Sequence, residues 1–143
     1  IRKMTFTGST EVGRILMRQS ADTIKKMSLE LGGNAPLLVF DDADLDVAVE
    51  GAMLSKFRNA GQTCVCANRI FVQDGIYDAF AKRLAEKAAS MTVGSGTSDG
   101  VEQGPLMDQQ GLEKVCGHVE DAIANGASVM AGGKPHSLGG SFF

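Results

Sequence analysis

The sequence predicts an α/β fold in which a largely parallel sheet is flanked by helices. Short β-prone segments alternate along the 143 residues with longer segments of helical periodicity, an order typical of βαβ units. The composition, 43% hydrophobic and 22% charged, is that of a globular protein with a buried core. Residues 36–40 are a continuous apolar run, as expected of a strand buried in such a sheet.

The first predicted unit is a strand, a turn and a helix. Residues 3–7 are short and β-prone, the sequence Gly-Ser-Thr at residues 8–10 interrupts them, and a helical pattern continues to about Gln19. A second strand is expected at residues 27–31. The sequence Gly-Gly-Asn at residues 32–34 then predicts a turn before the buried strand.

A capped helix, a strand and a second helix are expected next. The acidic residues 41–46 precede an apolar helical face, which predicts a helix ending near Phe57 or Asn59. Alternation of apolar and polar residues predicts a strand at residues 69–73. An apolar stripe at i, i+4 spacing that starts at Ile76 predicts a helix of about 15 residues.

The last part of the chain begins with a long loop. Four glycines lie between Val93 and Pro105, so regular structure is not expected there. Residues 109–124 are predicted to form a helix and residues 128–131 a final strand. Because Ile1 begins inside an apparent strand, we expect the chain to be an internal piece of a longer protein.

Charge and cysteine content narrow the function classes. The net charge is −3, and no Lys/Arg cluster interleaves with aromatic residues, so the sequence predicts a small-molecule partner and no nucleic acid or membrane. No apolar run approaches the ~18 residues that a spanning helix needs, and no secretory signal opens the chain. Three cysteines without such a signal predict free thiols and a cytoplasmic location.

The strongest local signal is FRNAGQTCVCANR, residues 57–69. Cys64 follows a Gly-Gln-Thr turn between a helix and a strand, a position at which a thiol can be accessible. Backbone N–H groups of the turn and a cation such as Arg58 would favour its thiolate, the nucleophilic form. From the spacing alone, burial of Cys64 and Cys66 as small apolar residues explains the pattern equally well.

Two further segments carry weaker signals. Glu30 precedes two glycines that allow a ligand to approach, so its carboxylate could act as a general base, although a solvated glutamate at a turn fits as well. Gly8 and Ser9 lie between a strand and a helix N-terminus, which suits a phosphate or a simple N-cap. The Cys-x-Cys spacing lacks a second pair, so no metal site is predicted.

In this order and spacing, FTGST, LELGGNAP and GQTC resemble the aldehyde dehydrogenase superfamily along essentially the whole chain. The resemblance implies an aldehyde dehydrogenase fold truncated at both ends. Residues 1–32 would be the C-terminal end of a cofactor-binding domain, and residues 33–143 the N-terminal part of a catalytic domain. Family members form dimers or tetramers, so a homo-oligomer of the full-length protein is expected.

The sequence around Cys64 is similar to succinate-semialdehyde dehydrogenases, which act in 4-aminobutanoate degradation and carry an arginine six positions before the nucleophile. The resemblance implies that the Cys64 thiolate attacks the aldehyde, that NAD or NADP takes the hydride, and that Glu30 activates the water that releases succinate. Arg58 would bind the distal carboxylate of succinate semialdehyde. Gly8 and Ser9 would contact the cofactor phosphates, and Leu31 would line the nicotinamide site.

The sequence allows alternatives for the role of Cys66, for the substrate and for the class of function. Cys66 either forms a reversible disulfide with Cys64 that switches the enzyme off, or only packs beside it. Arg58 indicates that the substrate carries a carboxylate, but it does not indicate the length of the substrate's carbon chain. Glutarate semialdehyde is therefore an alternative substrate. A non-catalytic binding or assembly module that retains the fold is the alternative from another class.

Overall fold

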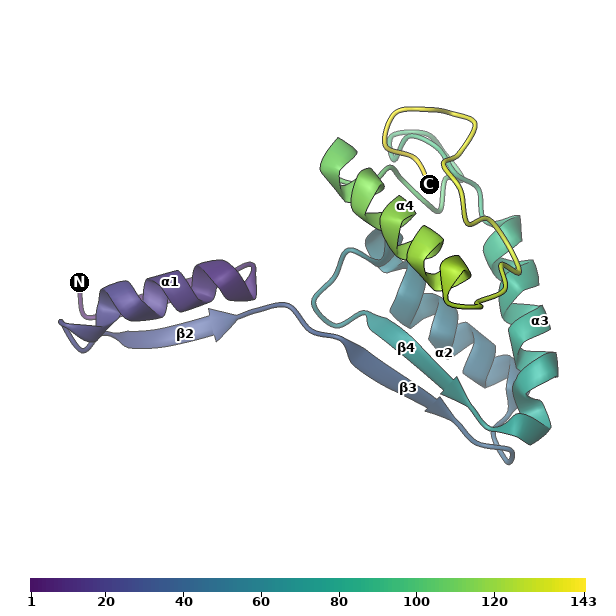
Figure 1. Ribbon diagram of the computed structural model, residues 1–143, viewed down its shortest axis with the longest axis horizontal. Helices are drawn as coiled ribbons and strands as arrows, with labels where there is room; N and C mark the ends of the chain where they lie inside the picture. The colour runs from purple at the N-terminus through teal and green to yellow at the C-terminus, as the bar shows by residue number, and fades with distance from the viewer.

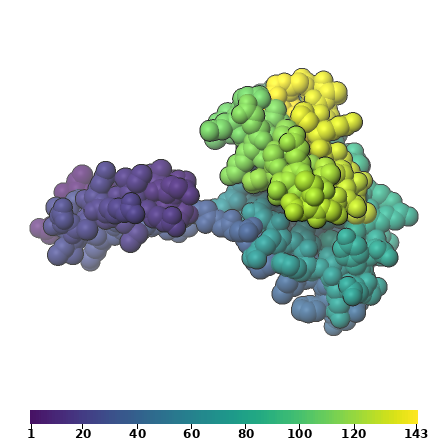
Figure 2. Space-filling view, viewed as in Figure 1, coloured from purple at the N-terminus to yellow at the C-terminus, as the bar shows by residue number.

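The computed structural model describes residues 1–143 and contains four strands, four α-helices and one short 3-10 helix. In chain order they are β1 (Lys3–Thr7), α1 (Thr10–Ala21), β2 (Lys26–Glu30), β3 (Ala35–Val39), α2 (Leu45–Phe57), η1 (Arg58–Gly61), β4 (Ala67–Val72), α3 (Asp74–Ser90) and α4 (Gln109–Ala124). The first three elements form a small unit that a thin segment joins to the rest (Figures 1 and 2). No helix is both long and apolar enough to span a bilayer.

The strands are parallel, as expected, but they form two sheets of two strands each. In one sheet β1 pairs with β2, and Thr7 lies opposite Glu30. In the other, β3 pairs with β4, and Val39 lies opposite Val72. Residues 31–34 separate β2 from β3 and pair with neither sheet. The α/β class is therefore confirmed, with the two sheets in different parts of the molecule.

The small N-terminal unit is a βαβ crossover whose helix lies on its sheet (Figure 1). Ser9 caps α1, because its side-chain oxygen accepts a hydrogen bond from the Val12 backbone N–H at 3.3 Å. Gly13 is buried, and a Cβ there would lie 2.9 Å from a methyl carbon of Leu31. A glycine at this position lets the helix approach the end of β2 closely.

The core of the larger unit lies between its sheet and helices α2 and α3. Val39 of β3, Val49 and Ala52 of α2, and Phe80 of α3 are buried together. Ion pairs Arg83–Asp46 and Lys87–Glu50 join the two helices on their exposed side. The predicted stripe that contains Phe80 is thus the buried face of α3. This packing supports the end of α2, from which the Cys64 turn begins.

Most predicted boundaries lie within two or three residues of the observed ones, and the bounds of the helix at residues 109–124 are confirmed. The strand predicted at residues 128–131 is wrong, because the structure has no strand there. An extended segment becomes a strand only when a neighbour completes its backbone hydrogen bonds. Backbone N–H groups of residues 128–131 donate no such bond.

The acidic start of α2 yields a test of local stability. The Asp44 carboxylate accepts hydrogen bonds from the backbone N–H groups of Asp46 and Val47 at 3.0 and 3.1 Å. We expect Asp44→Ala to lower the free energy of unfolding by about 1 kcal/mol, measured as a lower midpoint in thermal denaturation. The matched control is Asp42→Ala, since Asp42 is exposed and caps no helix. Equal midpoints for the two variants would contradict the cap.

Candidate active site

Cys64 lies on an exposed turn between η1 and β4. Three consecutive residues before it have a left-handed backbone, with φ of 52° at Asn59, 54° at Ala60 and 74° at Gly61. Asparagine and glycine adopt this conformation readily, whereas an alanine there costs about 1–2 kcal/mol. Strain of this kind persists only where the surroundings impose it, and it is common next to functional groups.

Hydrogen bonds within the segment before Cys64, and others from residues 103 and 107, hold this segment in place. Asn59 and Gln62 exchange side-chain to backbone bonds of 3.2 Å. The Gln62 side-chain oxygen also accepts from the Met107 N–H at 2.9 Å, and Gln103 donates to the Phe57 carbonyl at 2.6 Å. The glycine-rich loop after α3 therefore secures the turn that presents Cys64.

Cys66 has a different environment from Cys64. Only 1% of its surface is exposed, and its thiol donates to the Lys56 carbonyl at 3.5 Å. The Lys56 ammonium lies 3.6 Å from the Cys66 sulfur and donates to the Asn68 side chain at 3.0 Å. Both thiols are free in the structure. The disulfide between Cys64 and Cys66 stays a prediction, and it requires the buried Cys66 side chain to reach an exposed neighbour.

Glu30 is the exposed last residue of β2, and the segment that follows it meets the Cys64 turn (Figure 1). A Cβ on Gly33 would lie only 3.0 Å from the Cys64 carbonyl oxygen. The Asn68 side chain donates to the Gly33 carbonyl at 3.5 Å. The structure thus brings the LELGGN segment beside the turn of the candidate nucleophile, although the two are more than thirty residues apart along the chain.

The N-terminus of α1 offers free backbone donors next to Gly8. No protein atom accepts a hydrogen bond from the backbone N–H groups of Ser9 and Thr10. Hydrogen bonds from the Glu11 backbone N–H and then from the Ser9 hydroxyl hold the pKa of the Glu11 carboxyl below its usual value. Free backbone N–H groups at a helix N-terminus suit a negatively charged group such as a phosphate. The N-cap function of Ser9 is observed as well.

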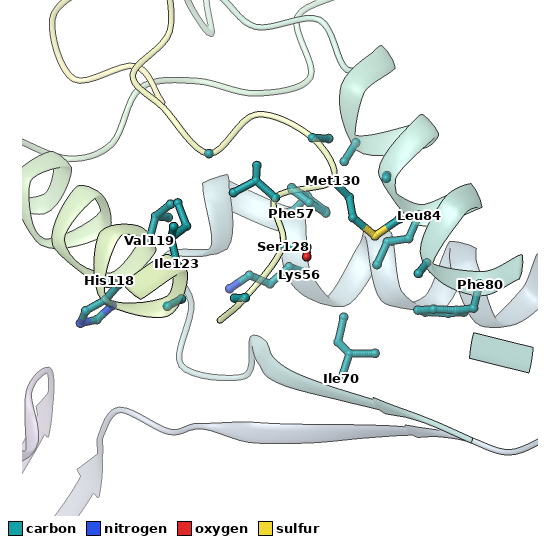
Figure 3. Close-up of a pocket in the computed structure, with 18 of the residues that line it drawn as sticks. Lys56, Phe57, Ile70, Phe80, Leu84, His118, Val119, Ile123, Ser128 and Met130 are labelled. Carbon is teal, nitrogen blue, oxygen red and sulfur yellow. The ribbon is translucent and has the colours of Figure 1, made fainter. Parts of the chain in front are cut away.

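Arg58 is exposed at the C-terminal end of α2 and makes no hydrogen bond or ion pair. It lines a cavity of about 470 Å³ together with the acidic residues Glu50 and Glu102. A second, mainly apolar cavity of about 690 Å³ lies between α3, α4 and the segment near residue 130. Figure 3 shows Phe57, Ile70, Leu84, Ile123 and Met130 among its lining side chains.

Neither of these two cavities is lined by Cys64 or Glu30. The structure thus brings the segment after Glu30 to the Cys64 turn, and neither of these two cavities contains both Arg58 and Cys64. The roles predicted for Arg58 and for Leu31, whose side chain lies against Gly13, stay predictions.

Sequence reasoning did not single out Lys56, Asn68 and Arg69, which hold the segments around Cys64. Arg69 donates two hydrogen bonds to the Asn34 carbonyl, of 2.9 and 3.2 Å. Asn68 and Arg69 belong to the FRNAGQTCVCANR motif, but the motif does not indicate which residues they bind. One sequence feature could have pointed to Arg69. It is a cation near the start of a predicted strand, five positions after the candidate nucleophile Cys64.

Comparison with known proteins gives one consistent result. The profile of the aldehyde dehydrogenase family matches residues 1–143. The chain is 63% identical to 3-sulfolactaldehyde dehydrogenase of Pseudomonas putida, 62% identical to glutarate-semialdehyde dehydrogenase of Pseudomonas aeruginosa, and 61% identical to NADP-dependent succinate-semialdehyde dehydrogenase of Escherichia coli. Each match covers all of this chain but only 29% or 30% of the relative.

Solved structures agree with the sequence relatives. The crystal structure of succinate-semialdehyde dehydrogenase from Burkholderia pseudomallei matches with a TM-score of 0.98 and 60% identity, over 100% of this chain and 30% of that one. At this identity, the two chains share their fold along the whole matched region.

Proposed function

The chain belongs to the aldehyde dehydrogenase family, and on that basis we propose that the protein oxidises succinate semialdehyde to succinate with NAD or NADP. One observation carries the proposal. The segment after Glu30 contacts the turn of the exposed Cys64, where a Cβ on Gly33 would lie 3.0 Å from the Cys64 carbonyl oxygen. This close approach of the segment that follows Glu30 to the turn that carries Cys64 supports the pairing of a candidate base with a candidate nucleophile.

The chemistry assigned to this chain's residues has two stages. In the first, the Cys64 thiolate forms a bond to the aldehyde carbon, and the resulting oxyanion takes a hydrogen bond from the Cys64 backbone N–H. When bound, NAD or NADP supplies the acceptor for the hydride of that carbon. In the second stage, Glu30 removes a proton from water, which attacks the thioester, releases the acid and frees the Cys64 thiol.

Cofactor binding is assigned to the N-terminal unit. The free N–H groups at the start of α1, beside Gly8 and Ser9, would hold a phosphate of the cofactor. Leu31, next to Glu30, would lie along the nicotinamide. The assignment of residues 1–32 to a cofactor-binding domain and of residues 33–143 to a catalytic domain is part of this proposal, and the separate sheets of the two parts support it.

The substrate class follows from the relatives and from Arg58. The names of the three relatives describe aldehydes that carry a second, anionic group, a carboxylate or a sulfonate. Arg58 is exposed, has no ion-pair partner, and follows the helix that leads to the Cys64 turn. A guanidinium binds such an anion with charge-assisted hydrogen bonds that an uncharged aldehyde cannot make.

Replacing Arg58 tests the substrate. In a full-length enzyme that carries these 143 residues, we expect Arg58→Leu to lower kcat/KM for succinate semialdehyde about a hundredfold, because one charge-assisted contact is lost. The value for butanal should stay the same. Absorbance of the reduced nicotinamide measures both, with each cofactor in turn. Arg18→Leu, another exposed arginine, is the matched control. Equal losses for both aldehydes would remove Arg58 from the substrate site.

Glutarate semialdehyde is the second candidate substrate, favoured by the relative at 62% identity. A series of semialdehyde acids of increasing chain length in the same assay separates the two, since pocket depth decides between them. If no aldehyde is oxidised, the non-catalytic binding module becomes the better hypothesis. A cytoplasmic location and a dimeric or tetrameric assembly complete the proposal, and the three free thiols fit a reducing compartment.

A further inference from the structure

The two parts of the molecule depend on a short segment for their relative placement. Residues 1–30 share no strand pairing, hydrogen bond or ion pair with residues 35–143. Figure 2 shows a narrow neck between them. A Cβ built on Gly32, within the neck, would have no neighbouring atom within 4 Å. The position of Glu30 relative to Cys64 is therefore decided by what holds residues 33 and 34.

Arg69 provides the main side-chain anchor for this segment. Its Nε and one terminal nitrogen both donate to the Asn34 carbonyl oxygen, at 3.2 and 2.9 Å, across 35 residues of sequence. The Phe71 ring lies 5.9 Å from the guanidinium carbon and keeps it in place. The Asn68 side chain adds a weaker bond of 3.5 Å to the Gly33 carbonyl. Because the Arg69 donor is charged, its hydrogen bonds to Asn34 are stronger than the Asn68 bond to Gly33.

The Cys64 turn is held by different contacts. The Cys66 thiol bonds to the Lys56 carbonyl, and the Ala67 N–H bonds to the Ser55 hydroxyl at 3.2 Å. These bonds join the turn to the end of α2 and do not involve Arg69. Loss of the Arg69 side chain would thus remove this anchor from the segment between Glu30 and Ala35, where β3 begins to pair with β4, while the contacts that hold the Cys64 turn remain.

We propose that Arg69 is a positioning residue for thioester hydrolysis, holding the segment at Asn34 so that the Glu30 carboxylate faces the acyl group on Cys64. The inference rests on the proposed function, in which Glu30 acts only in the second stage. Formation of the thioester by Cys64 should then proceed without Arg69, whereas its hydrolysis should be slow. A residue needed only for folding would affect both stages alike.

Rapid mixing of a full-length enzyme that carries these residues separates the stages. For Arg69→Ala we expect a burst of about one reduced nicotinamide per site at the wild-type rate, then steady turnover about tenfold slower. Arg69→Lys should lie between, because an ammonium cannot reproduce the two-pronged donation of a guanidinium. Added guanidinium ion should restore part of the Arg69→Ala turnover. Arg83→Ala, which removes an exposed arginine from the Asp46 ion pair, should leave both phases unchanged.

The outcomes are distinct. If burst amplitude and steady turnover fall in the same proportion, Arg69 acts through folding alone and the inference is overturned. Wild-type kinetics in Arg69→Ala also overturn it and leave the proposed function intact. An unsubstituted enzyme that oxidises no aldehyde overturns both.

Discussion

Replacing Cys64 by serine is expected to lower aldehyde oxidation at least about a thousandfold in a full-length enzyme that carries these residues. Cys64 lies exposed on a turn, and the proposed reaction needs its thiolate as the nucleophile. A serine hydroxyl keeps the size of the side chain but is almost entirely protonated at neutral pH. Initial rates of nicotinamide reduction measure the loss, and a cofactor fluorescence titration should show that NAD or NADP still binds.

Cys116 offers the matched control for this experiment. It is a free thiol as well, but it is half-buried in α4 and belongs to none of the segments that meet at the Cys64 turn. Cys116→Ser should therefore keep the wild-type rate. Oxidation by Cys64→Ser at more than about a tenth of the wild-type rate would show that another group is the nucleophile, and the dehydrogenase mechanism proposed above would be wrong.

The 143 residues expressed by themselves are expected to self-associate and to lack a sharp melting transition. Their accessible surface is 10115 Å², whereas a monomeric protein of 15.0 kDa would expose about 7,000 Å². Only 10 of the 143 residues are buried, so the core is too small to offset the conformational entropy of the chain. Large apolar side chains that remain exposed include Ile24, Leu54, Val65 and Met107.

Two measurements check this expectation. Light scattering after size-exclusion chromatography should report species larger than one chain, because apolar surface and unpaired strand edges are covered on association. Circular dichroism during heating should show a broad, shallow change. A monodisperse monomer with one steep unfolding transition would refute the prediction, and it would mean that the small core of Val49 and Phe80 is sufficient for independent folding.

The positions of helices and strands could be read from the sequence because their signals are local. Asp44 precedes the apolar face of α2 and caps it through bonds to residues two and three positions ahead. Asp108 caps α4 in a similar way, since its carboxylate accepts one hydrogen bond of 2.7 Å from the Gly111 backbone N–H. Hydrogen bonds between neighbours in sequence depend on the order of residue types, which is visible without a structure.

Strand pairing was less predictable, since it depends on a partner elsewhere in the chain. Residues 128–131 have the composition of a strand, but no backbone N–H among them donates to a neighbour. The division into two sheets was not predicted either, although all four strands that the structure contains were predicted. The alternation of apolar and polar residues, together with composition, indicates that a segment is extended. It does not indicate which other segment pairs with it.

For the candidate site too, some features were predictable from the sequence and others were not. The sequence by itself determined the family, through FTGST, LELGGNAP and GQTC, and with it the residues Cys64 and Glu30 as candidates. Only the tertiary structure decided that Gly33 lies so near the Cys64 carbonyl that a Cβ there would come within 3.0 Å of it, and that Arg69 bonds the Asn34 carbonyl. These contacts join segments more than thirty residues apart. They form only when the chain folds back on itself, so no local pattern of residue types records them.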